Sequence, residues 1–175
     1  MTGAPHVEVR GLTMAYGERL IQKDLSFEIR RGSVFVIMGD SGCGKSTLMR
    51  HMIGLNQPAA GDVLYDGEAY WAANDSARER IKRKFGVLYQ NAALFSSMTL
   101  GENVSLPLVE HAGLSARAAA GIAGLKLALV GLGGFEDHYP SEISGGMRKR
   151  AGLARAMPSI PRSSISTSLR PASIP

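Results

Sequence analysis

The chain has 175 residues, of which 45% are hydrophobic and 20% charged, and its formal net charge is +5. This length suffices for one domain with a buried core, and the single cysteine, Cys43, excludes an internal disulfide and fits a reducing compartment. No stretch approaches the ~20 apolar residues of a membrane span, and the N-terminus lacks signal-peptide character, so we expect a cytosolic protein or one peripheral to the inner face of the membrane.

The first part of the chain, up to about residue 90, is predicted to consist mainly of strands and turns. Residues 7–10 and 25–30 alternate apolar and polar side chains, as half-exposed strands do. Residues 62–65 predict a strand that runs into a turn at the following Asp-Gly pair, and residues 86–89 predict another short strand.

A glycine-rich stretch at residues 39–47 reads Gly-Asp-Ser-Gly-Cys-Gly-Lys-Ser-Thr and fits the phosphate-loop pattern G-x-x-x-x-G-K-[ST] at every fixed position. The apolar run 33–38 before it predicts a buried parallel strand, and residues 47–53 predict a helix that Gly54 ends. Strand, loop and helix in this order are typical of a phosphate-binding loop, whereas a chance glycine-rich turn would lack these neighbours.

Such a loop points successive backbone N–H groups at phosphate oxygens, and the helix N-terminus adds partial positive charge. The Lys45 ammonium would reach the β- and γ-phosphates, and the Ser46 hydroxyl can ligate Mg²⁺. We interpret Cys43 as a tolerated side chain rather than a redox switch. The candidate phosphate-binding residues are Gly39, Asp40, Ser41, Gly42, Cys43, Gly44, Lys45, Ser46 and Thr47.

After Gln90 the chain becomes rich in alanine and leucine. Ser115 predicts the cap of a helix over residues 116–130, despite the glycines within it. We therefore expect an α/β phosphate-loop fold, in which residues 1–90 form a nucleotide-binding core and residues 91–157 a helical subdomain.

Further motifs give the chain a family resemblance that covers residues 7–157. Tyr16, Gln90 and the run Ser144, Gly145 and Gly146 follow in the family's order, and residues 148–156 match the helix after that run. With the phosphate loop, these motifs resemble the ATP-binding subunit of an ABC transporter. Taken alone, Tyr16 could be a strand aromatic, Gln90 an ordinary polar residue and Ser-Gly-Gly a turn.

The resemblance implies roles for these residues. Tyr16 would stack on adenine, and Gln90 would contact Mg²⁺ and water and link the core to the helical part. Residues 144–146 would grip the γ-phosphate of ATP bound to a second subunit, so that two chains pair head to tail around two ATP molecules. Because the family is specific for ATP, ATP is favoured over GTP, with Mg²⁺ as the accompanying metal.

Within the family, the chain resembles the Mla-type transporters, which move phospholipids between membranes. Residues 88–95, 98–104 and 106–108 carry this likeness, together with Met147 in the signature. Asp40 replaces a more usual proline, and its carboxylate would weaken phosphate binding somewhat. The resemblance implies a membrane permease as partner, and it leaves the cargo and the direction of transport to that permease.

The resemblance stops after Met157, where the family continues into a strand that ends in the Asp-Glu pair used for Mg²⁺ and catalytic water. Residues 158–175 instead are rich in serine and proline, and we predict a disordered tail. If one guanine is restored after codon 157, the DNA can encode Leu-Asp-Glu-Pro, which matches the missing strand end. We therefore hypothesise that residues 158–175 are translated out of frame and that the fold is incomplete after the signature helix. No catalytic residue is then retained with certainty, although Lys45 and Gln90 would support catalysis.

Three functions remain open: a transporter energy-coupling subunit, a nucleotide-binding fragment without ATPase activity, and another phosphate-loop enzyme such as a small-molecule kinase. The signature argues against the kinase. Repairing the frame would make the net charge slightly negative, and the basic run at residues 78–84 is interpreted as a solvated helix face rather than a nucleic-acid patch. We therefore expect no nucleic acid as partner.

Overall fold

The structure is a computed structural model that describes residues 5–157 and 164–166. The chain forms two compact units, with the division between Lys82 and Arg83. The sequence predicts a nucleotide-binding core over residues 1–90, but this division places 83–90 with the helical unit. The reason is contact between the short strand β5 (Gly86–Leu88) and helix α5 (Gly145–Ala156).

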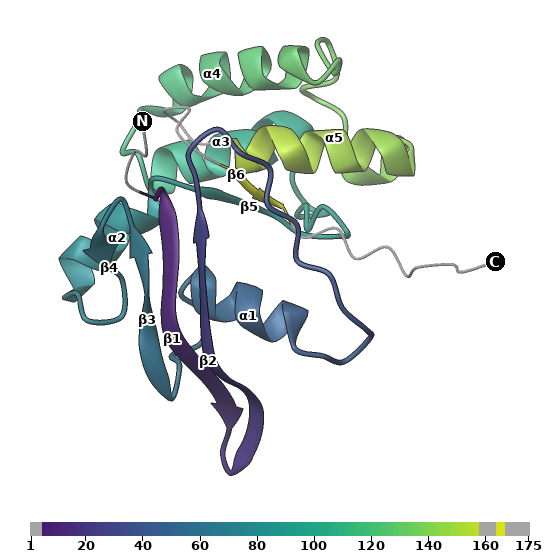
Figure 1. The fold of residues 1–175 in the computed structure, drawn as a ribbon. Coiled ribbons are helices and arrows are strands. Elements are labelled where there is room, and N and C mark those ends of the chain that lie inside the picture. Colours follow the sequence, from purple (N-terminus) through teal and green to yellow (C-terminus); the bar gives the residue numbers. More distant parts are fainter. Residues whose placement is uncertain (1–4, 158–163, 167–175) are drawn as a thin grey trace. The chain divides into compact units, whose positions relative to one another are not determined.

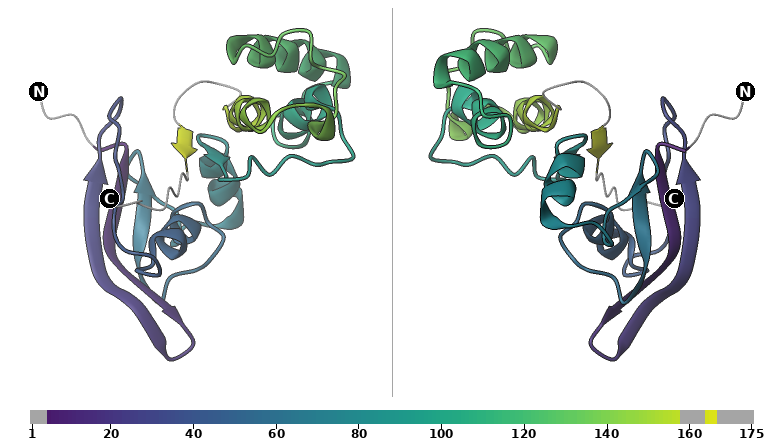
Figure 2. Two further views of the ribbon diagram at one scale, coloured as in Figure 1. Left: turned by 90° about the vertical axis from the view of Figure 1, so that its right-hand side faces the viewer. Right: turned by 90° about the vertical axis from the view of Figure 1, so that its left-hand side faces the viewer.

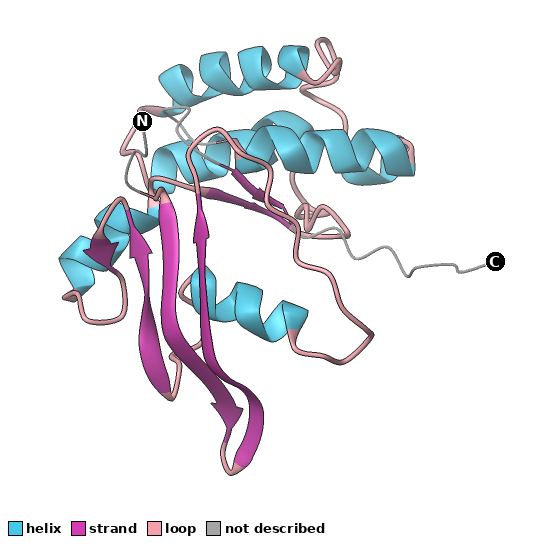
Figure 3. Ribbon diagram, in the orientation of Figure 1, coloured by secondary structure: helices cyan, strands magenta, loops and turns pink. Residues whose placement is uncertain are grey.

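The first unit is built on an antiparallel sheet with the strand order β2-β1-β3-β4 (Figure 3). The strands are β1 (Val7–Tyr16), β2 (Arg19–Ile29), β3 (Ala60–Tyr65) and β4 (Glu68–Ala69). The predicted strands at 7–10, 25–30 and 62–65 are confirmed, and the first two are longer than the alternation indicated. Their extra length belongs to a hairpin between β1 and β2, in which register shifts interrupt the simple alternation of side chains.

Two helices belong to the same unit. Helix α1 (Lys45–Met52) confirms the helix predicted after the glycine loop, and it lies against one face of the sheet (Figure 2). It buries Leu48, His51 and Met52. Helix α2 (Asp75–Lys82) follows β4 and buries Ile81.

The predicted strand at residues 33–38 is not present. The segment runs as a loop between β2 and α1 (Figure 3), and the side chains of Val34 and Met38 are 92% and 86% exposed. A parallel strand gains its hydrogen bonds and its burial from neighbouring strands, and no described residue pairs with this segment. The apolar run indicated strand propensity correctly, but propensity without a partner does not make a strand.

The second unit is mainly helical (Figure 1). It contains β5, α3 (Leu100–Glu110), α4 (Ala116–Leu129), a 3-10 turn at Pro140–Glu142 and α5. The predicted helix at 116–130 is confirmed, with Ser115 as its cap. The three long helices enclose a closed apolar core, whose members are Leu100, Val104, Ala123, Leu127, Leu132, Ile143, Ala151 and Ala154.

A further strand, β6 (Ser164–Ser166), pairs with β5 in parallel. It lies inside the segment for which we predicted a disordered tail, so these three residues differ from that expectation. Backbone hydrogen bonding to β5 explains how a serine-rich triplet can be extended here. The rest of residues 158–175 lies outside the described residues. Among the described helices, none has the length and apolar character that crossing a membrane requires.

Candidate functional site

The glycine loop curls at the start of α1, as the motif predicts. Gly42 and Gly44 have φ angles of 85° and 99°, which glycine adopts without strain. Gly44 is also the residue that caps the helix, and a Cβ there would lie 2.8 Å from the Cγ2 atom of Ile21 on β2. Both the turn and the close approach to β2 therefore require glycine at position 44.

The Lys45 side chain folds back over this loop. Its Nζ donates hydrogen bonds to the carbonyl oxygens of Gly39 and Asp40, each at 2.6 Å, and lies 3.6 Å from Sγ of Cys43. The ammonium thus spans the concave side of the loop. An anion that offers stronger acceptors than two neutral carbonyls can compete for the same donor.

Tyr16, at the end of β1, is brought to the helix that follows the loop. The residue is 45% exposed, and its hydroxyl accepts a hydrogen bond from Nδ2 of Asn56 at 3.1 Å. Hydrogen bonds to Thr47 and Arg50 on α1 lower the pKa of Tyr16. The structure therefore joins the predicted aromatic to the helix that follows the predicted loop, and leaves Tyr16 partly exposed.

A hollow of about 340 Å³ lies beside the loop in the same unit. Lys45, Cys43 and Gly44 line one part of it, and side chains of β2 and of the segment 33–38 line the rest. Gln22 on β2 donates from Nε2 to the carbonyl of Cys43 at 3.4 Å, which ties the loop to the sheet. Sequence reasoning missed Gln22, because its position opposite the loop depends on the register of the hairpin.

Ser46 and Thr47 lie in the first turn of α1, and the Ser46 side chain is exposed. Within the described part of the chain, no cluster of three or more His, Cys, Asp or Glu side chains could hold a metal. A serine hydroxyl combined with phosphate oxygens is a donor set that suits Mg²⁺, which binds with few protein ligands. The exposed Ser46 hydroxyl therefore fits the predicted metal.

The signature residues form the start of α5 in the second unit. Ser144 is the N-cap, and its Oγ accepts a hydrogen bond from the backbone N–H of Met147 at 3.2 Å. Gly145 and Gly146 occupy the first helical positions and are exposed, so their backbone N–H groups face solvent. This arrangement offers an anion the donors and the partial positive charge of a helix N-terminus.

Gln90 follows β5 and opens the loop that leads to α3. Sequence reasoning did not identify two residues that hold this loop, Arg155 on α5 and Asn103 on α3. A charged residue within the apolar helix 151–156 was the available signal for Arg155. Asn103 gave no signal, because a buried asparagine cannot be told from an exposed one by its neighbours in sequence.

The predicted site residues therefore fall into two sets. Tyr16 and residues 39–47 lie together in the first unit, while Gln90 and residues 144–146 lie in the second.

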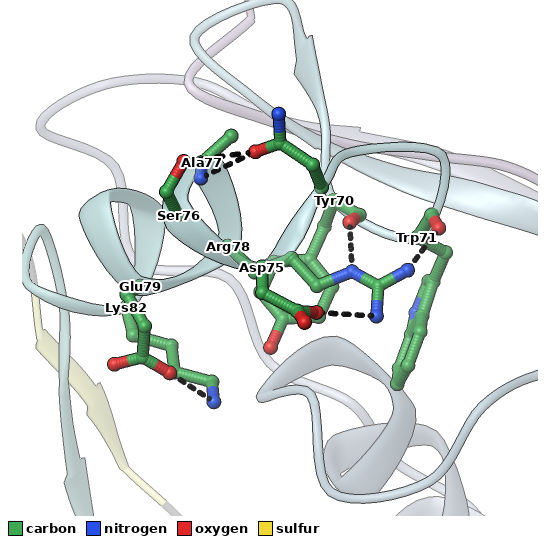
Figure 4. Close-up of polar contacts among 9 residues, drawn as sticks. Tyr70, Trp71, Asp75, Ser76, Ala77, Arg78, Glu79 and Lys82 are labelled. Atoms are coloured by element: carbon green, nitrogen blue, oxygen red, sulfur yellow. Dashed lines mark hydrogen bonds and ion pairs between the residues drawn. The ribbon is translucent and has the colours of Figure 1, made fainter.

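Within the basic run at residues 78–84, the residues Arg78, Arg80 and Lys82 have partners in the first unit, and Figure 4 shows those of Arg78 and Lys82. Arg78 donates to the backbone carbonyls of Tyr70 and Trp71 at 3.1 and 2.6 Å and lies over the Trp71 ring. Arg80 pairs with Glu68, and Lys82 with Glu79 at 2.8 Å. The predicted solvated face holds for Arg80 and Lys82, which are exposed, but Arg78 is half-buried because it braces the turn before α2.

The fold and the loop define the chain as a phosphate-loop protein. The sequence model described as ABC transporter matches residues 22–165, and the chain belongs to this family. A solved dimeric ATP-binding cassette, MJ0796 bound to ADP and phosphate, superposes with a TM-score of 0.79 at 30% identity, covering 91% of this chain and 72% of that one.

Two curated relatives each align over 151 residues, or 86% of this chain. A probable ribonucleotide transport ATP-binding protein of Mycobacterium leprae is 46% identical, and the alignment covers 44% of it. The intermembrane phospholipid transport ATP-binding protein MlaF of Escherichia coli K12 is 40% identical, with 56% covered. The chain thus spans about half the length of the curated relatives it matches. The family and the α/β fold expected from the sequence are confirmed.

Proposed function

We propose that the chain is the ATP-binding part of an ABC transporter subunit that couples ATP binding and hydrolysis to transport. One observation carries the proposal: the Lys45 ammonium lies across the concave side of a glycine loop at the N-terminus of α1. On binding, the phosphate tail of ATP would replace the Gly39 and Asp40 carbonyls as acceptors of Lys45, and the loop amides would add further donors.

The remaining residues complete a nucleotide site in this proposal. Tyr16, which is partly exposed, stacks on the adenine, while Asn56 holds its hydroxyl. Ser46 and Gln90 are the residues that would hold Mg²⁺, which neutralises phosphate charge when bound. Residues 144–146 offer a helix N-terminus to the γ-phosphate of a nucleotide held by a second copy of the chain. The proposed partner is therefore that second copy, paired head to tail in a homodimer.

The proposed cargo is a phospholipid, and the proposed membrane partner is a permease at the inner face of the cell membrane. Support for the cargo comes from the Mla-type residues around Gln90 and from the likeness to MlaF. Another relative is named for ribonucleotide transport, so the test must distinguish a phospholipid cargo from a nucleotide cargo. Co-expression with a candidate permease should yield a complex whose ATP turnover rises with phospholipid, and a response to nucleotides instead would overturn the lipid assignment.

A second candidate is a nucleotide-binding fragment without ATPase activity. It is favoured by the unpaired segment 33–38, whose apolar side chains lie exposed where a strand was predicted. In this reading the serine- and proline-rich residues after Met157 supply neither a metal-binding aspartate nor a catalytic glutamate. Repairing the proposed frame and comparing ATP turnover of the two chains separates the candidates, because only the fragment reading expects turnover to rise from background.

The test of nucleotide binding is calorimetry with MgATP on the 175-residue chain. Lys45→Ala should weaken ATP affinity about 100-fold, because charged hydrogen bonds to phosphate are lost. Lys23→Ala removes an exposed ammonium from β2 and serves as the matched control with unchanged affinity. Equal affinity of the Lys45→Ala variant and the unmodified chain would overturn the proposal.

A further inference from the structure

The loop between β5 and α3 contains a strained turn. Ala92 and Ala93 have φ angles of 60° and 51°, a left-handed conformation that costs free energy for any residue with a side chain. The turn is closed by hydrogen bonds from the N–H of Ala92 to the Tyr89 carbonyl and from the N–H of Ala93 to the Asn91 carbonyl, at 2.9 and 2.6 Å. Two adjacent strained alanines persist only if the surroundings hold them.

Helix α5 supplies what holds the turn. The guanidinium of Arg155 donates to the carbonyl oxygens of Ala93 and Ala92, at 2.6 and 3.2 Å. The same group lies 5.9 Å from the centre of the Phe95 ring. Arg155 therefore contacts three residues of the loop: Ala92, Ala93 and Phe95. Arginine suits this task because its planar fork donates to two acceptors at once and stays charged.

The helix backbone also approaches the turn closely. A Cβ on Gly152 would lie 2.7 Å from the Cβ of Ala92, a distance that side chains do not tolerate. Gly152 therefore lets the turn rest directly on α5, one helical turn before Arg155.

The backbone at the other end of the loop is hydrogen-bonded to α3. Asn103 is fully buried, and its Oδ1 accepts from the N–H of Phe95 at 2.7 Å. Its Nδ2 donates to the carbonyls of Phe95, Met98 and Thr99, at 3.0, 3.1 and 2.9 Å. Since Asn103 anchors residues 95–99, the part of the loop that depends on α5 is the part nearest Gln90.

We propose that Arg155 is a positioning residue that sets the place of Gln90 by clamping the Ala92–Ala93 turn to the helix that Ser144 begins. This inference rests on the proposed function, in which Gln90 serves the metal and Ser144 the nucleotide. Arg155 lies in the last turn of α5, and the turn that it holds begins two residues after Gln90.

The test separates the metal-dependent part of ATP binding from the rest. The affinity of the 175-residue chain for ATP is measured by calorimetry in EDTA and again with Mg²⁺, and the ratio is the gain due to the metal. Arg155→Ala should reduce this gain about fivefold to tenfold, leaving affinity in EDTA unchanged, because the loop amides and Lys45 are not altered. A residue that merely stabilises the fold would lower both affinities together.

Three variants sharpen the result. Arg155→Lys should recover part of the gain, since an ammonium cannot bind both carbonyls in the fork geometry. Gln90→Ala should lose the gain by itself, and adding Arg155→Ala to it should cause no further loss, because both changes act on one path. Arg150→Ala, an exposed charge on the same helix, is the matched control with an unchanged gain.

The outcomes distinguish this inference from the proposed function. If the unmodified chain fails to bind ATP, the proposed function fails and the inference falls with it. If the unmodified chain binds ATP with a gain from Mg²⁺ and Arg155→Ala retains the full gain, the inference alone is wrong. Additive losses in the double variant would also overturn it, since Arg155 would then act independently of Gln90.

Discussion

The apolar core positions of helices α3, α4 and α5 and the apolar segment 33–38 before the glycine loop differ sharply in burial. In the helical unit, Leu127 and Ala151 are completely buried in a core to which α3, α4 and α5 all contribute. In the sheet unit, the four strands and α1 bury one apolar layer, yet Val34 and Met38 in the segment before the glycine loop are almost fully exposed.

The cause lies in how helices and parallel strands satisfy their backbones. A helix pairs its N–H and C=O groups internally and needs only one apolar contact face, which α3, α4 and α5 give one another. A parallel strand needs at least one neighbouring strand to accept and donate its backbone hydrogen bonds. Residues 33–38 have no paired neighbour among the described residues, and they therefore remain a loop.

The largest expected effect tests the closed core of the helical unit. Leu127→Ala should lower the free energy of unfolding by about 3 kcal/mol, because a fully buried leucine leaves a cavity. Leu129→Ala on the same helix removes a side chain that is 78% exposed and should change stability by less than about 0.5 kcal/mol. Urea unfolding of the full chain measures both, and similar losses would contradict the closed core.

A smaller effect tests the packing of the glycine loop in the sheet unit. Gly44→Ala should cost about 2 kcal/mol and weaken ATP binding, since the new Cβ meets Ile21 and the φ of 99° is strained. Gly42→Ala shares a positive φ but has open space around its Cβ, so it isolates the strain alone. Denaturation combined with calorimetry measures the difference, and equal losses would show that contact with β2 is unimportant.

Capping of the helices should have an effect of about 1 kcal/mol. Ser144→Ala removes the acceptor for the Met147 N–H, and Ser115→Ala removes the acceptor for the Ala118 N–H. We expect equal losses of stability in denaturation experiments, but only the Ser144 variant should weaken ATP-induced dimerisation in light scattering. Loss of dimerisation in both variants would point to general destabilisation.

The smallest effect concerns acid pH and the sheet unit. Burial raises the pKa of Asp66, but hydrogen bonds and charges from His6 and Arg31 outweigh it and lower the pKa below its ordinary value of 3.8. The unfolded chain therefore binds the proton more tightly, so this contribution is present above pH ~4 and is lost as the pH falls further. It should stay below about 1 kcal/mol, since partly exposed ion pairs are screened.

Urea unfolding at about pH 6 and about pH 3 measures this contribution. The loss of stability on acidification should be smaller in Asp66→Asn than in the unmodified chain. An identical pH dependence of the two chains would assign the acid sensitivity to other carboxylates.

The helix caps and the glycine loop could be predicted because each depends on residues only a few positions apart. Ser115 and Ser144 cap helices through bonds to residues three positions later, and Gly44 permits a backbone angle within its own turn. The strand predicted at 33–38 was wrong, because its formation depends on a partner far away in the chain. Gln22 and Arg155 escaped prediction for a related reason, since their partners lie far away in the chain. Asn103 escaped because its neighbours in sequence do not reveal that it is buried.

The sequence by itself determined the glycine loop, the helix starts and the family, since these depend on residue types at short, fixed spacings. Tertiary structure alone decided that Asn56 holds the Tyr16 hydroxyl and that Arg155 binds the strained turn at Ala92 and Ala93. A hydrogen bond forms only where folding brings donor and acceptor within about 3 Å, and no spacing along a chain encodes that distance for segments that meet through the fold.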